Sequence, residues 1–514
     1  MIKKATNPLL RIIFLFYIFI IPKRIKFGNL ENLDFKKADF TNYKKIKLLI
    51  FKNDFIKDNS EQIINNFDFL NYTIKIGGKK GIEISKKNIF EWHKANKLKI
   101  NKLWDSETIA NRALNLIYNF EYINSISSAK EENKLRKIII NNINRLTFEL
   151  RLKNIINLTF LELKAYILIN ILLDKKNLNY EKIFNKIIEN QLDRLSIHKS
   201  YNLLEHSKCI NHISEIINIL LRFKRKIPEI FFITRLKMIT ALSQYFHKDG
   251  SIALFNGANN SYIKEMLFVL KNESNLRKIK YPKEENGIFF YEDKNKKIFL
   301  DVIQPSKSLL SKKLSASTLA IEFSSFKEKI ITNCGALEKF GGNAGYLRYT
   351  AAHSALILNN TNISEIRDNQ PHLKFPQTVN FKKNYSNSSI ICEGSHNGYV
   401  KNYKKIIKRK IFFNDKDGNL YGEDHIISSI SKNHEVVFHI RFHIMPNINI
   451  TETNNKRGII LKTKNKHIWT FKANADLILE ESIFVDKSNT IKTNQILIKG
   501  ITKNNREVVK WSLI

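Results

Sequence analysis

The hydrophobic pattern of this chain changes from a helical period to a strand period near Asn286. From about Trp92 to Lys280, Leu and Ile recur at three- and four-residue spacing and Gly and Pro are almost absent, which predicts amphipathic helices. After Asn286, short alternating apolar runs are separated by turn residues, which predicts strands. This switch constrains the chain to a multidomain α+β architecture, in which a helical domain precedes a β-domain.

In the helical part, the segment from Lys134 to Leu173 has apolar positions that can be divided between two or more packed helices. No strict repeat is visible at roughly 30 to 45 residues. We therefore expect successive antiparallel helical hairpins, in a solenoid or a closed toroid. Further helices are expected at Glu107 to Phe120, Tyr180 to Leu195, Leu203 to Phe223 and Ile230 to Phe246.

In the β part, the frequency and shortness of the predicted strands favour an antiparallel β-sandwich. One of these strands, Thr350 to Leu358, is expected to carry His353. The basic run from Lys401 to Lys410 is predicted to form a strand with one cationic face. We interpret that face as a solvated sheet edge protected from aggregation, with a surface for an anionic polysaccharide as the alternative.

The charge and composition of the chain indicate which classes of binding partner are expected. The formal charge is +38, from 86 Lys and Arg against 48 Asp and Glu. Because Lys is spread along the chain and accompanied by abundant Ile, Asn and Phe, we favour a solvated surface set by composition over a basic cleft selected for an anionic partner. No basic motif with interleaved aromatic residues occurs, so no nucleic-acid partner is predicted. With 514 residues and 43% hydrophobic content, the chain is expected to form two or three globular domains.

The three cysteines, Cys209, Cys334 and Cys392, form no CxxC pair and no even-numbered framework. Neither a disulfide scaffold nor a zinc knuckle is predicted. We expect all three to be buried as small hydrophobic residues.

The N-terminus carries an apolar run, Ile12 to Ile21, with basic residues on both flanks. The run is shorter than the about 20 residues that span a bilayer. An uncleaved export signal, an interfacial anchor and a buried first helix are equal alternatives. Peripheral membrane contact through residues 9–26, with a periplasmic or membrane-associated location, therefore stands beside a cytoplasmic location.

The run from Asn333 to Glu365, NCGALEKFGGNAGYLRYTAAHSALILNNTNISE, resembles the C-terminal β-domain of the heparinase II/III-like family, whose members include polysaccharide lyases. HKDGSIALFNGA, from His247 to Ala258, resembles the end of the family's helical domain, and RFHIMP, from Arg441 to Pro446, resembles a sandwich strand. The resemblance implies an N-terminal α/α-toroid, a C-terminal antiparallel β-sandwich and a sugar-binding cleft between them. The domains expected on this basis are a basic-apolar segment at 1–35, a mixed region at 36–91, the toroid at 92–285 and the sandwich at 286–514.

For family members that are lyases, the implied reaction is β-elimination at a uronic acid. One group neutralises the carboxylate, a base removes the C5 proton and an acid protonates the departing O4. The first hypothesis is therefore a polysaccharide lyase-like protein acting on an anionic, uronate-containing glycan without a cofactor. The second is a non-catalytic glycan-binding or envelope-assembly protein that retains the lyase fold.

The resemblance also implies site residues. In the stretch from Leu195 to Asn202, His198 matches a family histidine and Tyr201 stands where an arginine is usual, while the acid/base tyrosine of active lyases would fall near Glu205 and His206. Arg348 follows a Gly-rich loop, from which it could contact a carboxylate, and His396 has turn residues on both sides. The predicted catalytic residues are His198, Tyr201 and His353, and the predicted substrate contacts are Asn202, Arg348, Tyr349 and His396.

Three departures from the family pattern support the second hypothesis, and the first is the missing acid/base tyrosine near Glu205 and His206. The family's NH-x-x-E motif is nearest to the segment from Asn157 to Glu162, which lacks the histidine and has the glutamate one residue late. A His-centred motif that precedes one of the sandwich strands is replaced by Ser315-Ala316-Ser317. A base or metal ligand is lost there, and no metal is predicted.

Overall fold

The computed structural model describes residues 61–99, 102–153, 157–175, 178–271, 287–337, 343–368, 370–386, 389–414, 418–431, 434–454, 456–486 and 489–514. The chain divides into two compact units. The helical unit contains the described residues up to Leu192 together with Cys209–Arg235, and the β unit contains Asp193–Lys208 and Leu236–Ile514. The apolar run from Ile12 to Ile21 lies outside the described residues.

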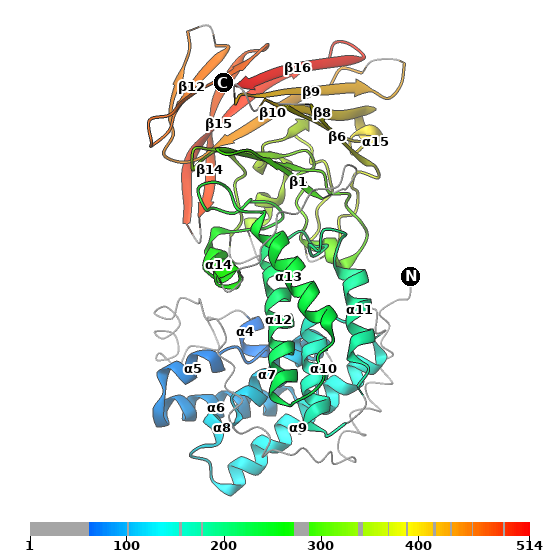
Figure 1. Ribbon diagram of the computed structural model, residues 1–514, viewed down its shortest axis with the longest axis vertical. Helices are drawn as coiled ribbons and strands as arrows, with labels where there is room; N and C mark the ends of the chain where they lie inside the picture. Colours follow the sequence, from blue (N-terminus) through cyan, green and yellow to red (C-terminus); the bar gives the residue numbers. More distant parts are fainter. Residues whose placement is uncertain are drawn as a thin grey trace. The chain divides into compact units, whose positions relative to one another are not determined.

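The helical unit is built from consecutive α-helices, as the apolar periodicity predicts (Figure 1). Each helix expected from the sequence is present within a few residues of its predicted bounds, and residues 61–91, for which no structure was predicted, are mainly helical as well. The helices before the first strand are α4 Glu61–Asn65, α5 Leu70–Ile76, α6 Gly78–Asn96, α7 Ser106–Tyr118, α8 Phe120–Asn124, α9 Ala129–Leu152, α10 Phe160–Leu172, α11 Tyr180–Gln191, α12 Leu203–Arg222, α13 Glu229–Ser243 and α14 Ile263–Lys271. The start of α12, the second half of α13 and all of α14 belong to the β unit.

Glu162 has a structural part in the helical unit. Thr159 and Glu162 form a capping box at the start of α10, in which each side chain accepts a hydrogen bond from the other residue's backbone N–H. The same carboxylate is buried and accepts 2.7 Å hydrogen bonds from Nζ of Lys153 at both oxygens. Glu162, the nearest match to the glutamate of the family motif, therefore fastens the start of a helix.

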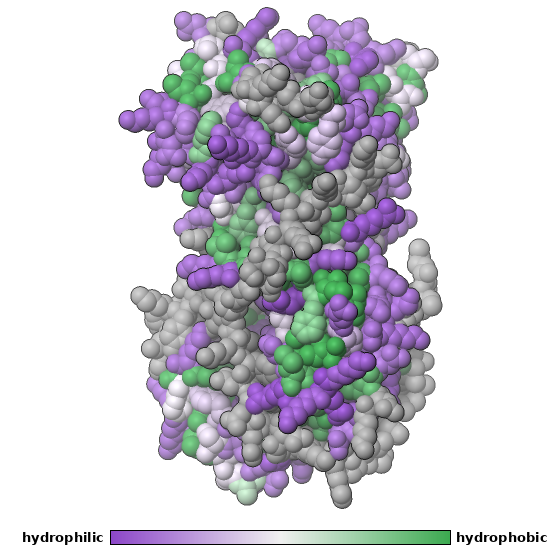
Figure 2. All heavy atoms as spheres, viewed as in Figure 1, coloured by the Kyte–Doolittle hydropathy of each residue, from purple (hydrophilic) through white to green (hydrophobic). Residues whose placement is uncertain are grey.

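The β unit contains two eight-stranded antiparallel sheets with a continuous hydrophobic core (Figure 1). The first sheet has the order β1-β2-β3-β4-β10-β15-β14, with β5 paired to β10, and the second has the order β11-β12-β13-β16-β9-β8-β7-β6. Alternating strand residues supply the core, and Figure 2 shows hydrophilic side chains over most of the visible face of this unit. The strands are β1 Ile288–Glu292, β2 Lys296–Asp301, β3 Ile321–Ser325, β4 Glu328–Thr332, β5 Leu356–Leu358, β6 Val379–Ser386, β7 Ser389–His396, β8 Lys405–Asn414, β9 Leu420–Ser428, β10 Val437–Ile444, β11 Asn449–Glu452, β12 Gly458–Lys462, β13 Ile468–Ala473, β14 Leu477–Asp486, β15 Asn489–Ile501 and β16 Arg506–Leu513.

The basic segment that forms β8 does not lie at a sheet edge, so the prediction of a solvated edge is wrong. β8 pairs with β7 on one side and β9 on the other. On one face, Lys408 and Lys410 form ion pairs with Glu393 of β7, at 2.7 and 3.4 Å. On the other face, Arg409 is fully buried and forms two hydrogen bonds with Asp424. Acidic residues on neighbouring strands neutralise the positive charges of β8. The sequence of β8 alone does not show these partners.

The predicted strand from Thr350 to Leu358 is also shorter than expected. Only Leu356–Leu358 is extended, whereas Thr350–Ala352 form a 3-10 helix and His353 follows it. The hydroxyl of Thr350 donates a 2.8 Å hydrogen bond to the carbonyl of Ala316, which holds the segment in a tight turn. His353 therefore lies in a loop before the strand.

The three cysteines are free and buried, which confirms that prediction. Within the ranges that the structure describes, none of the helices has the length and apolar character needed to cross a bilayer.

Candidate functional site

The loop of residues 312–318, which we call the central loop, brings two of the predicted groups of site residues together in the β unit. Asn256 accepts a 2.9 Å hydrogen bond from the backbone N–H of Ser315, and its carbonyl accepts a 2.7 Å bond from the amide of Asn202. The backbone N–H of Ala316 donates to the carbonyl of Arg348, at 2.8 Å. The segment of His198 and the segment of His353 are thus both anchored to the central loop.

His198 is held as a neutral hydrogen-bond donor. Its Nδ1 accepts from the backbone N–H of Ser200 at 3.3 Å and lies 2.7 Å from the Ser200 hydroxyl, so the ring proton is on Nε2. Burial lowers the pKa of His198 to about 4, so the ring is uncharged at neutral pH. Tyr201 closes the same turn, with its N–H on the His198 carbonyl at 2.8 Å and a left-handed φ of 48°. The side chain of Tyr201 is half-buried.

The positions beside this turn are already engaged in other contacts. Glu205 forms ion pairs with Lys313 at 2.6 Å and with Lys208 at 3.2 Å. Burial alone would raise the pKa of Glu205, but the two lysines hold it at about 2, so the side chain is a carboxylate. His206 donates from Nε2 to the carbonyl of Met238 and accepts at Nδ1 from the backbone N–H of His198. Both ring nitrogens of His206 are used, which indicates a structural role.

His353 is in the opposite tautomer to His198 and presents a hydrogen-bond acceptor. Its Nδ1 donates to the carbonyl of Tyr349 at 2.8 Å, which leaves the lone pair on Nε2. Burial lowers the pKa of His353 to about 4. His353 can therefore accept a proton or a hydrogen bond through Nε2 at neutral pH.

Arg348 and Tyr349, the neighbours of His353, differ in accessibility. The guanidinium of Arg348 is buried and donates to the carbonyls of Leu314, Lys312 and Arg367. These bonds fasten the central loop, in place of the expected contact with a carboxylate. Tyr349 is 45% exposed and remains available for a ligand.

His396 and His443 fit into the sandwich as structural residues. His396 ends β7 and accepts at Nδ1 from the N–H of Gly398 at 3.1 Å, so it caps the turn that follows the strand. Burial first, and then the charge of Arg409, lower its pKa to about 3. His443 donates from Nε2 to the carbonyl of Ala351 at 3.0 Å and lies 2.7 Å from the Ser482 hydroxyl at Nδ1. His396 does not join the His198 or the His353 group, whereas His443 lies beside the His353 segment and fastens it through Ala351 and Ser354.

A buried polar cluster behind this region was not predicted from the sequence. Glu322, the second residue of β3, accepts from Nε2 of His247 at 2.8 Å, from Nζ of Lys329 at 3.1 Å and from the backbone N–H groups of Asn333 at 2.9 Å and Leu254 at 3.1 Å. Burial would raise the pKa of Glu322, but Lys329 and His247 hold it at about 2. An acidic residue inside the apolar strand IEFSS is the sequence signal that could have revealed the cluster.

The residues at the changed family motif do not fit a zinc ion. Ser317 donates its hydroxyl proton to Asp301 at 2.6 Å, and burial raises the pKa of Asp301 to about 7. Structural and catalytic zinc sites use Cys, His and carboxylate ligands, whereas Ser315 and Ser317 offer neutral hydroxyls. Within the described ranges, no three His, Cys, Asp or Glu side chains are grouped to hold a metal.

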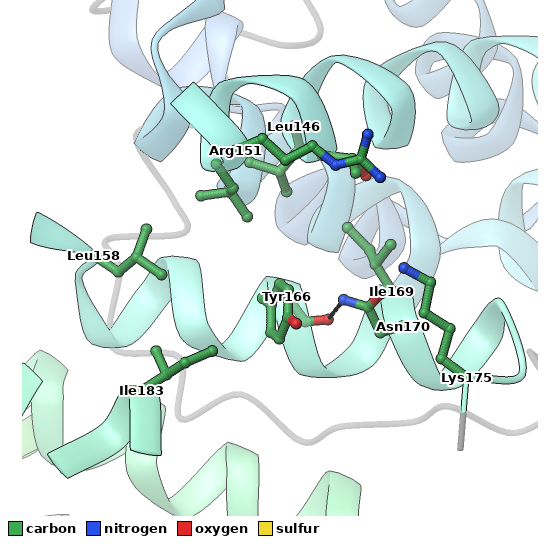
Figure 3. A pocket seen from close by; sticks show the side chains of 10 residues that line it. Leu146, Arg151, Leu158, Tyr166, Ile169, Asn170, Lys175 and Ile183 are labelled. Carbon is green, nitrogen blue, oxygen red and sulfur yellow. Dashed lines mark hydrogen bonds between the residues drawn. The ribbon is translucent and has the colours of Figure 1, made fainter. Parts of the chain in front are cut away.

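A separate pocket of about 190 Å³ lies in the helical unit (Figure 3). Its apolar wall comes from α9, α10 and the start of α11, and Arg151 and Lys175 add positive charge. Figure 3 shows the basic ends of both side chains on the same side as Asn170, whose amide donates to the carbonyl of Tyr166 at 2.7 Å. None of the predicted site residues lines this pocket.

Comparison with known proteins finds a family model that matches part of the chain and solved structures of similar fold. Residues 283–512 match the family model described as heparinase II/III-like, C-terminal. A crystal structure of the heparan sulfate lyase HepC from Pedobacter heparinus aligns with a TM-score of 0.60 and 13% identity, over 98% of this chain and 87% of HepC. A crystal structure of heparinase III aligns with a TM-score of 0.72 and 11% identity, over 97% of this chain and 88% of that protein. Comparison with curated proteins gave no match. These similarities confirm the predicted fold class of α/α-toroid followed by antiparallel β-sandwich.

Proposed function

Residues 283–512 belong to the heparinase II/III-like C-terminal family, and from that premise we propose that the protein is a lyase that cleaves an anionic, uronate-containing glycan by β-elimination. The single observation that carries the proposal is that the two segments anchored to the central loop each present a neutral imidazole, and that the two imidazoles are in opposite tautomers. His353 presents an unprotonated Nε2, and His198 presents an Nε2–H. Both pKa values are lowered to about 4, so these forms persist at neutral pH.

The proposed reaction assigns one role to each group. His353 removes the C5 proton through Nε2, because this nitrogen carries the lone pair of a neutral imidazole. His198 donates its Nε2–H to the uronate carboxylate, which stabilises the charge that develops as the C5 proton leaves. Tyr201, in the turn of His198, protonates the departing O4, and Tyr349 contacts the sugar. Asn202 is buried, and its amide bonds to the carbonyl of Asn256 and to the N–H of Glu205, so it positions the turn. Electrons move from the C5–H bond into a new C4–C5 double bond as the C4–O4 bond breaks.

An incubation with a panel of polyuronates and glycosaminoglycans tests this proposal. Purified full-length protein should generate the ultraviolet absorbance of unsaturated chain ends with at least one member of the panel. His353→Gln and His198→Gln should each lower the rate by about 100-fold or more, the typical contribution of an acid or base catalyst. The matched control is His467→Gln, since this side chain is 40% exposed and lies outside both groups. A folded protein without activity on the whole panel would refute the lyase assignment.

A second candidate function is glycan binding without turnover. Ser315-Ala316-Ser317 replaces the His-centred motif of the family, and the Arg348 guanidinium is occupied by backbone carbonyls. Retention of the protein on an immobilised anionic glycan, without release of unsaturated ends, would favour this function over the lyase. Either function places the glycan in or outside the cell envelope, so we propose a periplasmic or membrane-associated location, which cell fractionation tests.

A further inference from the structure

The connection between α12 and α13 concentrates positive charge at one end of a helical hairpin in the helical unit. Of residues 222–226, RFKRK, all but Phe223 are basic. The hairpin is antiparallel, because Nε of Arg235 near the start of α13 donates to the hydroxyl of Ser214 in the second half of α12, at 2.7 Å. The end of α12 and the start of α13 therefore lie together, and we call residues 221–233 the hairpin tip.

The hairpin tip also exposes large apolar side chains. Leu221 is 58% exposed, Phe232 is 46% exposed and Ile233 is 39% exposed. Figure 2 shows hydrophobic side chains on the visible surface over α13. Exposed residues of this size are costly in water when they are gathered, so a group of them next to a basic segment marks an interaction surface.

Contacts with α11 fix the conformation of the hairpin tip. Phe231, next to the exposed Phe232, is fully buried and stacks on Phe184 of α11, with ring centroids 3.9 Å apart. The hydroxyl of Tyr180 donates to the carbonyl of Lys226. The outward direction of Phe232 and Ile233 therefore follows from the packing of Phe231.

Lys224 occupies a left-handed backbone position at the end of α12, where glycine is the preferred residue. The N–H of Lys224 donates to the carbonyl of Leu221 and the N–H of Arg225 donates to the carbonyl of Leu220, which is the bond pattern of a Schellman motif. In this motif the residue at the position of Lys224 is left-handed, here with a φ of 51°, and glycine is the residue preferred there. A lysine at this position adds an exposed positive charge to the hairpin tip.

We propose that the hairpin tip docks on an anionic lipid surface. The lysines would lie among the headgroups, and Leu221, Phe232 and Ile233 would enter the boundary between headgroups and acyl chains. An anionic lipid surface explains both the basic segment and the exposed apolar side chains, because it attracts positive charge and buries apolar side chains on the same face. The surface is independent of the proposed glycan site, whose residues all belong to the β unit.

Sedimentation of the full-length protein with vesicles tests the proposal. We expect binding to vesicles of phosphatidylcholine with phosphatidylglycerol, and weak binding to phosphatidylcholine alone. Lys224→Ala and Lys226→Ala should each lower the partition coefficient about fivefold. Phe232→Ser should lower it about tenfold, and this effect should persist at high salt, where the charge contribution is screened. A matched control is the double variant Lys130→Ala with Lys137→Ala, which removes two exposed lysines of α9.

Lys224→Gly separates a binding role from a structural one. Glycine at this left-handed position should leave the thermal midpoint unchanged or raise it, while membrane binding falls about fivefold. Unchanged binding of Lys224→Gly and Phe232→Ser would overturn the proposal, and binding that fell equally in the α9 control would do the same. Tighter retention on double-stranded DNA than on anionic vesicles, lost in Lys224→Gly, would also overturn it in favour of a nucleic acid.

Discussion

Replacing Glu322 with alanine is expected to bring the β unit close to unfolding. The change removes the acceptor shared by His247, Lys329 and the backbone N–H groups of Leu254 and Asn333. The ammonium group of Lys329 would stay buried with only the carbonyl of Ile252 as a partner in the described structure. Breaking a buried ion pair in this way costs about 3–5 kcal/mol. That is a large share of the about 5–15 kcal/mol that stabilises a typical domain.

A double-mutant cycle would separate the charge from the packing. Glu322→Gln keeps the shape and removes the charge, and Lys329→Met removes the opposite charge. Each single variant leaves one buried group unpaired, so the double variant should lose less stability than the two singles together, by about 0.5–3 kcal/mol. The exposed pair of Glu365 and Lys374, 2.9 Å apart with side chains 45% and 61% exposed, serves as the control. Glu365→Ala should cost less than about 1 kcal/mol.

Hydrogen exchange of peptides from β3 and β4, measured against urea concentration, would report the stability of the β unit separately from that of the helical unit. The pKa of Glu322 is lowered to about 2, so its contribution is complete above about pH 4.5 and is lost as the pH falls toward 2. Measurements at pH 7 therefore record the full effect. A loss below about 1 kcal/mol for Glu322→Ala would refute the reasoning, because it would mean that this cluster contributes no more than a surface pair.

Three further predictions concern pH, packing and the capping of a helix. Several buried histidines of the β unit have pKa values lowered to about 4 or below, so their contribution to stability is complete above about pH 6.5 and is lost as the pH falls, by up to about 1.4 kcal/mol per pH unit for each. The near-ultraviolet circular dichroism of the β unit should therefore disappear between pH 6.5 and 4, and an unchanged spectrum at pH 4 would contradict this expectation. The histidines are His198, His206, His353, His372, His396 and His443. Gly422→Ala would place a Cβ 2.1 Å from the ring of Trp511 and should cost about 1–3 kcal/mol in urea denaturation, with Gly345→Ala, where the Cβ meets no neighbour, as the control. Glu162→Gln should weaken the cap of α10 and its bond to Lys153, and a loss of about 1–3 kcal/mol in the helical unit is expected by the same measurement.

The sequence was sufficient to predict the order and type of the main elements. The three- and four-residue spacing in α9, and the alternation in β13, reflect local burial, which acts on neighbouring positions along the chain. The prediction of strand position and of loop conformation was less accurate where contacts between residues distant in sequence determine the structure. β8 was placed at an edge because the acidic partner of its lysines, Glu393, lies on another strand. The turn at Thr350 was missed because its hydroxyl bonds to Ala316, far away in sequence.

For the candidate site, the sequence alone indicated the resemblance to a family and most of the residue types, including His198 and His353, which remain predicted catalytic residues. The tertiary structure decided the protonation form of each histidine, because the tautomer depends on which partner each ring nitrogen meets. It also indicated that Arg348 and His396 fasten loops, which their positions in the sequence could not reveal. Periodicity records which residues are buried, whereas the chemistry of a buried group depends on contacts that form only when distant segments pack together.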